Sequence, residues 1–528
     1  MSIYPSRELL PRRASFCPGE PIAVEVRGEV TPGIARVFHL GDLVAEVDWQ
    51  GGDIELPALP EGGYGVELGD LSTAIEVAAD SRSRLRYGFV ASYAPDKDLA
   101  GVTDTVRRLH LNAMQFYDWA YRHADLMGGG EEYRDALDQP IALSTVRALA
   151  KAVQTAGSRA LGYAAVYAAG PQEWDRWKHR ALLTASGVPY ALGDFLYILD
   201  PAAPDWLEHF TADLVNSTAS IGFDGYHLDQ YGYPKRASRP DGVAIDVGAS
   251  FVTLIEAARD ALPDAHLVFN NVNDFPTRRT AATRQGAVYI EPWAPQLTLQ
   301  ALADTATRAR AHGGGKPVVL AAYQHVYDKA PTAEADRATA LTMAALYSHG
   351  ATQLLAGEAD RLLCDPYYVR NHVIEPSTAA LLKRWYDFLV AHDELLMPPE
   401  LTDVTNAYAG PYNGDLDVSF SGADLSETAV AGQVWRRIVA APDGRLVIHL
   451  INLVGQPDTL WDAPRAAPAA PGAATLRYRR PGTATPRVMV ADPDGAGRLV
   501  EVPSRLDGDY LVAELPALAV WQVVVVGT

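Results

Sequence analysis

Residues 205–229 carry the pattern that decides the fold: DWLEHFTADLVNSTAS (205–220) is followed by GFDGYHLD (222–229). The first stretch repeats its apolar residues at the 3.6-residue period of an amphipathic helix, and the second is a short run typical of a buried strand. The same alternation continues on both sides of this pair, so one repeating strand–helix unit is expected over the middle of the chain.

Eight strand-like runs occur between residues 85 and 402, with amphipathic stretches between them. The runs are LRYGFVAS (85–92), LNAMQFYDW (111–119), RALGYAAVY (159–167), GFDGYHLD (222–229), HLVFNNV (266–272), AVYIEPW (287–293), KPVVLAAYQ (316–324) and ATQLLAG (351–357). The number and order of these units predict a (β/α)8 TIM barrel over residues 85–402. A doubly wound open sheet is the alternative, but no GxGxxG or P-loop motif follows any run.

Both ends of the chain have the rhythm of β domains. Runs such as PIAVEVRG (21–28) and GGYGVELG (62–69) lie between Gly/Pro turns, which predicts an Ig-like β-sandwich over residues 1–84. The tail repeats this style in RLVIHLINLVG (445–455), which predicts an antiparallel β-sandwich domain over residues 403–528. Within it, DAPRAAPAAPGAA (462–474) is too rich in Pro and Ala to hold a regular element.

The composition excludes several classes of partner. The chain has 528 residues, and 45 Lys and Arg against 65 Asp and Glu give a net charge of −20. Such an acidic surface without a Lys/Arg run repels nucleic acid and anionic lipid, so neither is expected as a partner. The N-terminus lacks the apolar core of a signal peptide and no apolar run could span a bilayer, which predicts a cytoplasmic protein, or a secreted one whose leader was removed. The oligomeric state stays open.

The active site of a barrel lies in the loops at the carboxyl ends of its strands. Polar and aromatic residues gather at these ends in most of the predicted units. The decorated ends are FYDW (116–119), HLDQY (227–231), NN (270–271), EPW (291–293), YQH (323–325) and GE (357–358). Strand ends elsewhere on a protein need not be so decorated, so we expect the active site at this rim.

Asp229 and Glu291 are the candidate catalytic residues. Side chains alternate along a strand, so His227 and Asp229 share the inward face of the fourth strand and Glu291 points inward from the sixth. Two carboxylates about 5–5.5 Å apart serve a retaining glycosidase, one as nucleophile and one as general acid/base. The acid needs a raised pKa, which an apolar wall at Trp293 and the charge of Asp229 are expected to supply. A structural ion pair is the alternative for either carboxylate.

The remaining candidates are substrate-binding residues. Aromatic rings offer flat faces to the C–H face of a sugar, while amides and carboxylates bind its hydroxyls. The predicted binding residues are Tyr117, Asp118, Trp119, Tyr163, Tyr167, His227, Tyr231, Asn270, Asn271, Trp293, Tyr323, Gln324 and Glu358. His227 and Asp229 also resemble a metal pair, but a catalytic zinc site takes three protein ligands and no second compact motif supplies them. We therefore expect no metal and no cofactor.

The stretches GFDGYHLDQYG (222–232) and VYIEPW (288–293) resemble glycoside hydrolase family 66, the family of dextranases and cycloisomaltooligosaccharide glucanotransferases. QFYDWAYRHADL (115–126) and LGYAAVYAA (161–169) are also similar to motifs of that family, and the likeness covers most of the chain. The resemblance implies that Asp229 is the nucleophile, that Glu291 is the general acid/base and that Asp118 lines the innermost sugar site.

The activity that the resemblance implies is retaining hydrolysis of α-1,6-glucosidic bonds in dextran or isomaltooligosaccharides, as in an endo-acting dextranase, through a covalent glycosyl-enzyme intermediate. The connecting loops look too short for the extra carbohydrate-binding module that the cyclising members carry, which favours hydrolysis over cyclisation. The alternatives are transglycosylation at the same site, hydrolysis of another α-glycoside, a non-catalytic sugar-binding protein and a metal hydrolase.

Overall fold

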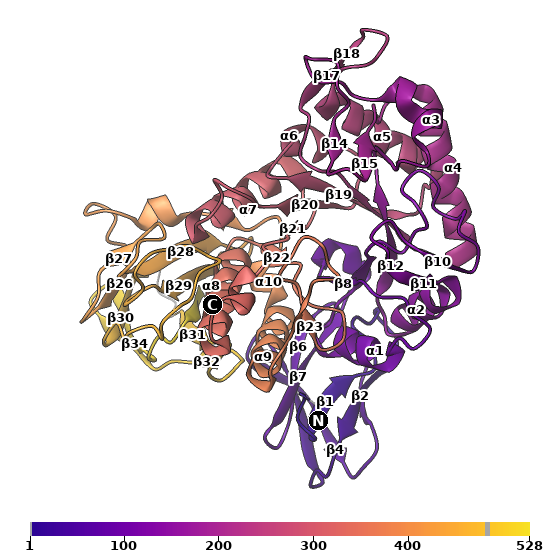
Figure 1. Cartoon of the computed structure of the whole chain (residues 1–528). Helices are drawn as coiled ribbons and strands as arrows, with labels where there is room; N and C mark the ends of the chain where they lie inside the picture. The colour runs from indigo at the N-terminus through magenta and orange to yellow at the C-terminus, as the bar shows by residue number, and fades with distance from the viewer. Residues whose placement is uncertain (1–2, 481–485, 528) are drawn as a thin grey trace.

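The computed structural model describes residues 3–480 and 486–527. Eight parallel strands form the central sheet, in the order β22-β21-β20-β19-β16-β12-β9-β8 (Figure 1). These strands are β8 (Tyr87–Val90), β9 (Ala113–Phe116), β12 (Arg159–Ala165), β16 (Gly225–Asp229), β19 (His266–Val272), β20 (Ala287–Glu291), β21 (Val318–Leu320) and β22 (Ala351–Gln353). The amide of Phe89 on β8 donates to the carbonyl of Ala356, just after β22, so the sheet closes. The predicted (β/α)8 barrel is confirmed.

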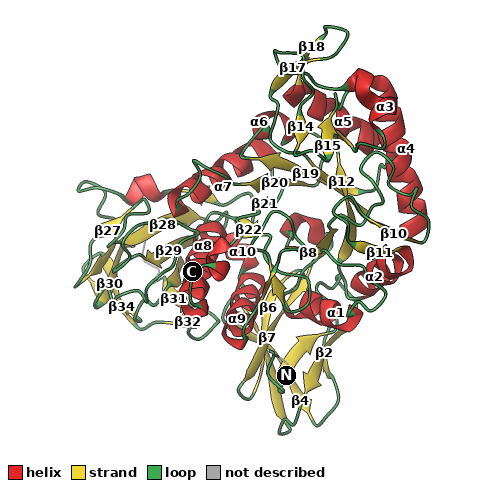
Figure 2. Cartoon of the chain, in the orientation of Figure 1, coloured by secondary structure: helices red, strands yellow, loops and turns green. Residues whose placement is uncertain are grey.

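Helices cover the outside of the barrel between successive strands (Figure 2). The long ones are α1 (Leu99–Arg108), α2 (Leu143–Thr155), α4 (Pro204–Ile221), α5 (Val247–Ala261), α7 (Leu299–Gly313), α8 (Thr332–Ser348) and α9 (Pro376–Ala391). The connection between β19 and β20 is shorter and holds α6 (Thr277–Thr280), a single turn. The sequence has no amphipathic stretch at that point, which agrees with the missing long helix.

Helix α4 shows how the sequence sets one unit of the barrel. Pro204 opens the first turn, where its missing N–H costs no hydrogen bond, and Gly222 follows the last turn with a left-handed φ of 87°. Phe210 and Leu214 lie on the buried face of the helix. The hydroxyl of Tyr226 on β16 donates to the carbonyl of Leu214, so the outward face of this strand is bonded to its helix.

The N-terminal region forms two facing antiparallel sheets, as predicted for a β-sandwich. One sheet has the order β1-β2-β5 and the other β4-β3-β6-β7. The strands are β1 (Glu8–Pro11), β2 (Ile22–Arg27), β3 (Gly33–His39), β4 (Asp42–Trp49), β5 (Ile54–Leu56), β6 (Gly62–Leu68) and β7 (Leu71–Val77). A doubly hydrogen-bonded ion pair joins this region to the barrel, because Arg86 beside β8 donates to both oxygens of Glu76 on β7 at 2.8 Å.

The C-terminal region also forms two antiparallel sheets, which pack against the side of the barrel that carries α8 and α9 (Figure 1). The longer strands are β26 (Leu416–Phe420), β28 (Val434–Ala440), β29 (Leu446–Asn452), β30 (Ala474–Arg479), β31 (Arg487–Ala491), β34 (Tyr510–Leu515) and β35 (Trp521–Gly527). The Pro/Ala-rich segment holds no regular element until β30 begins at Ala474. Throughout the described part of the chain, no helix has both the length and the apolar character to cross a bilayer.

Candidate active site

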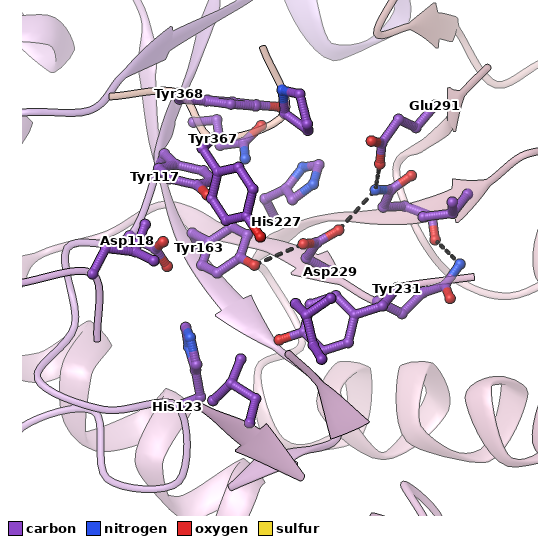
Figure 3. A pocket seen from close by; sticks show the side chains of 18 of the residues that line it. Tyr117, Asp118, His123, Tyr163, His227, Asp229, Tyr231, Glu291, Tyr367 and Tyr368 are labelled. Carbon is purple, nitrogen blue, oxygen red and sulfur yellow. Dashed lines mark hydrogen bonds between the residues drawn. The ribbon is translucent and has the colours of Figure 1, made fainter. Parts of the chain in front are cut away.

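A cavity of about 240 Å³ opens at the carboxyl ends of the barrel strands (Figure 3). Its wall combines residues from the strand ends with residues from longer loops. The lining residues are Gln115, Tyr117, Asp118, His123, Leu137, Tyr163, Leu192, Phe195, Leu196, His227, Asp229, Gln230, Tyr231, Asn270, Val272, Glu291, Trp293, Tyr323, Pro366, Tyr367 and Tyr368. The structure therefore brings most of the predicted site residues together at the predicted rim.

One side-chain amide joins the two candidate catalytic carboxylates. Nδ2 of Asn270, on the strand between theirs, donates to Oδ1 of Asp229 and to Oε2 of Glu291, each at 2.7 Å. Two bonds of that length to one nitrogen keep the two carboxylate oxygens within twice 2.7 Å, or 5.4 Å. This limit fits the spacing of a retaining pair and excludes the roughly 6.5–9.5 Å of an inverting pair for these two oxygens.

Asp229 and Glu291 have different neighbours, and these neighbours shift the pKa values of the two carboxylates differently. Burial raises the pKa of Asp229, and hydrogen bonds from the Tyr163 hydroxyl (2.7 Å) and from Asn270 oppose that rise. Burial and the charge of Asp229 raise the pKa of Glu291 to about 7. Trp293 acts against the expectation from the sequence, because its Nε1 donates to Oε1 of Glu291 at 3.0 Å and so lowers the pKa of Glu291. An ionised Asp229 beside a protonated Glu291 suits an acid/base pair near neutral pH.

Stacked rings form the floor beneath Asp229. His227 lies parallel to Tyr163, with ring centroids 6.2 Å apart and 11° between the planes, and meets Tyr289 edge-on at 4.7 Å. The Tyr87 hydroxyl lies 3.3 Å from Nδ1 of His227. Burial lowers the pKa of His227 to about 3. This histidine is therefore a neutral support for Tyr163 at ordinary pH.

Asp118 and His123 lie in the loop after β9 and face the cavity (Figure 3). Asp118 has a left-handed φ of 43°, which is strained for a residue with a Cβ. Its buried Oδ1 has no hydrogen-bond partner, and burial together with Asp135 and Asp229 raises its pKa well above the usual value. Burial lowers the pKa of His123 to about 4. A carboxyl with a raised pKa and a neutral imidazole offer hydrogen-bonding atoms to the hydroxyl groups of an uncharged ligand.

Trp119 and Tyr167 lie outside the cavity and support its wall from behind. Trp119 is fully buried, and its Nε1 donates to the backbone carbonyl of Tyr163 at 3.1 Å. The hydroxyl of Tyr167 accepts the backbone N–H of Tyr231, and the two rings stack with centroids 5.4 Å apart. Both residues act on a cavity residue, so the structure gives them a structural place where the sequence suggested substrate contact.

Asn271, Gln324 and Glu358 also lie outside the cavity. Asn271 and Gln324 point away from the barrel axis because the residue before each of them points inward. The amide of Asn271 donates to the backbone of Tyr289 at 2.8 Å, and that of Gln324 to the backbone of Ala322. Glu358 forms a buried ion pair with Lys97. Their polar groups are occupied within the fold.

Sequence reasoning missed the contributions of distant loops. Tyr368, in the loop after β22, stacks on Tyr117 with ring centroids 4.3 Å apart. Leu192 and Phe195 come from the hairpin of β14 (Ala191–Leu192) and β15 (Leu196–Ile198) and add an apolar lip. Leu137 adds to it from the loop after β9. The only available signal for Tyr368 was an aromatic pair, YY (367–368), after the eighth strand.

His227 and Asp229, the possible metal pair, have no third metal ligand near them in the part of the chain that the structure describes. Among the described residues, no group of three His, Cys, Asp or Glu side chains is placed to hold a metal ion. Both carboxylate oxygens of Asp229 already accept hydrogen bonds from Tyr163 and Asn270.

Comparison with known proteins places this site in a family. The model for glycosyl hydrolase family 66 matches residues 48–525. The chain belongs to glycosyl hydrolase family 66. The match starts in the N-terminal β-sandwich, includes the barrel with Asp229 and Glu291, and ends in β35, so the resemblance noted in the sequence is confirmed.

Relatives in the family include two enzymes of different names. A cycloisomaltooligosaccharide glucanotransferase of Niallia circulans is 26% identical over 371 residues, which are 61% of this chain and 38% of that protein. A dextranase of Streptococcus salivarius is 23% identical over 313 residues, 51% of this chain and 37% of that protein. The chain thus spans less than two-fifths of the length of these relatives. A crystal structure of a Paenibacillus cycloisomaltooligosaccharide glucanotransferase complexed with cycloisomaltoheptaose shares the fold, with a TM-score of 0.88, 20% identity and 99% coverage of both chains.

Proposed function

We propose that this chain is a retaining glycoside hydrolase that cleaves α-1,6-glucosidic bonds in dextran or isomaltooligosaccharides. The observation that carries the proposal is the pair of carboxylates, Asp229 and Glu291, held within 5.4 Å by one amide in the cavity of a family 66 barrel. The relatives named dextranase and cycloisomaltooligosaccharide glucanotransferase support the substrate class.

In the first step, a carboxylate oxygen of Asp229 attacks the anomeric carbon while the bond to the leaving oxygen breaks. Glu291 gives its proton to that oxygen, and a glycosyl ester forms on Asp229. In the second step, Glu291 takes a proton from water as the water oxygen bonds to the anomeric carbon and the ester breaks. The two inversions leave the α configuration unchanged, and Glu291 ends protonated as it began.

The walls of the cavity fit a neutral sugar ring. Tyr117, stacked on Tyr368, and Tyr231 present flat apolar surfaces, while the neutral imidazole of His123 and the carboxyl of Asp118, whose pKa is raised, present polar atoms. A site that binds hydroxyl groups without charge suits an α-glucan and needs no cofactor. A net charge of −20 also argues against nucleic acid as a partner.

Transglycosylation at the same site is the second candidate function. The apolar lip of Leu192, Phe195 and Leu137 favours it, because an apolar surface in the cavity that holds Asp229 binds a sugar ring better than it binds water. Chemistry with a sugar hydroxyl as acceptor uses the same two carboxylates.

We also propose that the two β regions, over residues 1–84 and 403–528, brace the barrel at 85–402, as the Arg86–Glu76 pair suggests.

Incubation with dextran and with isomaltooligosaccharides of several lengths tests the proposal, with products resolved by size and anomer. We expect products that first appear as the α-anomer, with fragment lengths that report endo or exo action. Elongated or cyclic products in excess of hydrolysis products would favour the transferase. β-Anomeric products would reject retention, and no turnover of any length would reject the α-1,6 substrate.

A further inference from the structure

Among the described residues, Asn270 is the one whose side chain lies between the two carboxylates and donates to both. It lies on β19, between the strands that carry Asp229 and Glu291, and its side chain is 3% exposed. Its Nδ2 uses both hydrogens on the carboxylates. The sequence suggested that this amide binds sugar hydroxyls, but only Oδ1 is left for that, and it has no partner within the protein.

The orientation of this amide follows from its neighbours. If Oδ1 replaced Nδ2, an oxygen would face two carboxylate oxygens at 2.7 Å, and both acids would have to be protonated at once. The backbone beneath the side chain is also held, because Nε2 of Gln230 donates to the carbonyl of Asn270 at 3.1 Å. A buried amide with fixed backbone and two short bonds has little freedom to move.

We infer that Asn270 is a positioning residue that sets the separation of Asp229 and Glu291 and keeps the single proton of the pair on one carboxylate at a time. The inference rests on the proposed function, since it gives the pair its acid and base roles. One neutral donor that bonds to both oxygens favours the ionised form of each carboxylate without adding a charge. It also keeps the two groups from sharing one proton directly, as closely spaced acids otherwise do.

The same amide serves both halves of the reaction. Before the first step, it stabilises the anion of Asp229 while the proton stays on Glu291. Once Asp229 is esterified, its charge is gone, so the repulsion that raised the pKa of Glu291 disappears. The amide then stabilises the Glu291 anion, which is the base that the second step needs. Removal of the amide should therefore disturb both steps.

The groups that face the two carboxylates, other than Asn270, are unchanged in sequence in an Asn270 variant. The titratable and polar groups that face the two carboxylates are Tyr163, Tyr231, Tyr117, Asp118 and the neutral His227 around Asp229, and Trp293, Tyr323, Tyr289 and Tyr368 around Glu291. Apart from Asp118, none of these residues carries a charge at neutral pH, and burial raises the pKa of Asp118 well above its usual value. A shift of the pH profile in an Asn270 variant thus reports the loss of its two bonds.

Two variants separate the donor role from simple packing. Asn270→Ala removes both bonds, and Asn270→Asp keeps the shape but replaces the donor with a third acceptor. We expect a fall in kcat of about 10²–10³-fold for Asn270→Ala, in the range seen when one preorganised donor is removed. Both limbs of its pH profile should move to higher pH, since both acids lose a bond that favoured their anions. Asn270→Asp should be no more active than Asn270→Ala.

The decisive measurement is an infrared pH titration of the buried carboxyl C=O band, with Glu291→Gln to assign the band and Asn271→Ala as the control for loss of a buried amide. The Glu291 band should persist to higher pH in Asn270→Ala than in the wild type, and Asn271→Ala should leave it unmoved. An unmoved band in Asn270→Ala, or wild-type kinetics in Asn270→Asp, would overturn the inference. The titration needs no substrate, so failure of the wild type on every α-glucan would reject the proposed function separately.

Discussion

The hydroxyl of Tyr163 donates to Oδ2 of Asp229 at 2.7 Å, so the proposed nucleophile has a second donor on the oxygen that Asn270 does not reach. Tyr163→Phe removes this donor and should raise the pKa of Asp229. Because Asp229 must be ionised to attack, the acidic limb of kcat/KM should move up by about one pH unit. Tyr167→Phe is the matched control, since its hydroxyl contacts backbone atoms. An acidic limb that stays in place in Tyr163→Phe would contradict the assignment.

Glu291 sets the other limb of the profile. Its pKa is raised to about 7 by burial and by Asp229, and it must be protonated to act as acid, so kcat/KM should fall as pH rises above about 7. Trp293→Phe removes the indole donor to Oε1 and should move this basic limb to higher pH. Trp119→Phe, which loses an indole bond to the backbone outside the cavity, should leave the limb unchanged. Activity that keeps rising well above neutral pH would exclude Glu291 as the acid.

An added anion should restore the activity that is lost when Asp229, the proposed nucleophile, is removed. Asp229→Ala should lower turnover by several orders of magnitude, and azide should restore activity by entering the vacated space, with an inverted β-glycosyl azide as product. Glu291→Ala with an activated substrate should instead give the azide with retained configuration, because Asp229 still forms the ester. Product anomers by NMR distinguish the two. The same azide anomer from both variants would reject the separate roles.

The Asp118 carboxyl should lower the free energy of unfolding at neutral and higher pH. Its pKa is raised above that of an unfolded chain, so the folded state holds a proton that the unfolded state releases above about pH 4. Its contribution to stability is full below that pH and is lost as pH rises toward the folded pKa. Asp118→Asn mimics the neutral acid, and its melting temperature at pH 8 should exceed that of the wild type by a few degrees. A lower melting temperature of Asp118→Asn at pH 8 would contradict the raised pKa of Asp118.

Substitution at the buried Glu76–Arg86 pair tests whether the N-terminal region stabilises the barrel. Glu76→Ala leaves a guanidinium that is 2% exposed without its carboxylate, which should cost about 3–5 kcal/mol of unfolding free energy. Turnover per folded molecule should stay near wild type, since Arg86 precedes β8 at the amino end of the barrel and neither member of the pair lines the cavity. Arg36→Ala, at the exposed pair with Glu46, should cost less than about 1 kcal/mol. Equal losses in both variants would reject the bracing role.

The strand ends could be predicted from the sequence because the alternation of side chains along a strand is local. Leu228 and Asp229, or Asn270 and Asn271, are one position apart and face opposite ways, and that rule predicted the inward positions of Asp229 and Glu291, which line the cavity. The same rule, applied more strictly, would have excluded Asn271 and Gln324, which follow inward-facing residues. Their prediction as ligands came from residue type alone.

The loop residues could not be predicted, because their positions depend on long-range packing. Tyr368 reaches Tyr117 only because the chain after β22 returns over the barrel mouth. The contact of Trp293 with Glu291 depends on the indole rotating its N–H toward the carboxylate two residues earlier, so a ring expected to desolvate the acid became its donor. The short α6 was indicated only by the lack of an amphipathic stretch between the fifth and sixth strands.

The hairpin that carries Leu192 and Phe195 is a separate piece of chain from every strand that supplies the carboxylates and their amide. Within the hairpin, Ala191 pairs with Tyr197 and Leu192 with Leu196, and β15 also pairs with the two-residue strand β13 (Ala168–Ala169) that follows β12. If the hairpin determines the acceptor, as the proposal of transglycosylation implies, the acceptor and the bond-breaking chemistry depend on different segments of the chain. Exchange of residues 191–198 between members of the family should then change the acceptor while the two carboxylates and their amide stay in place.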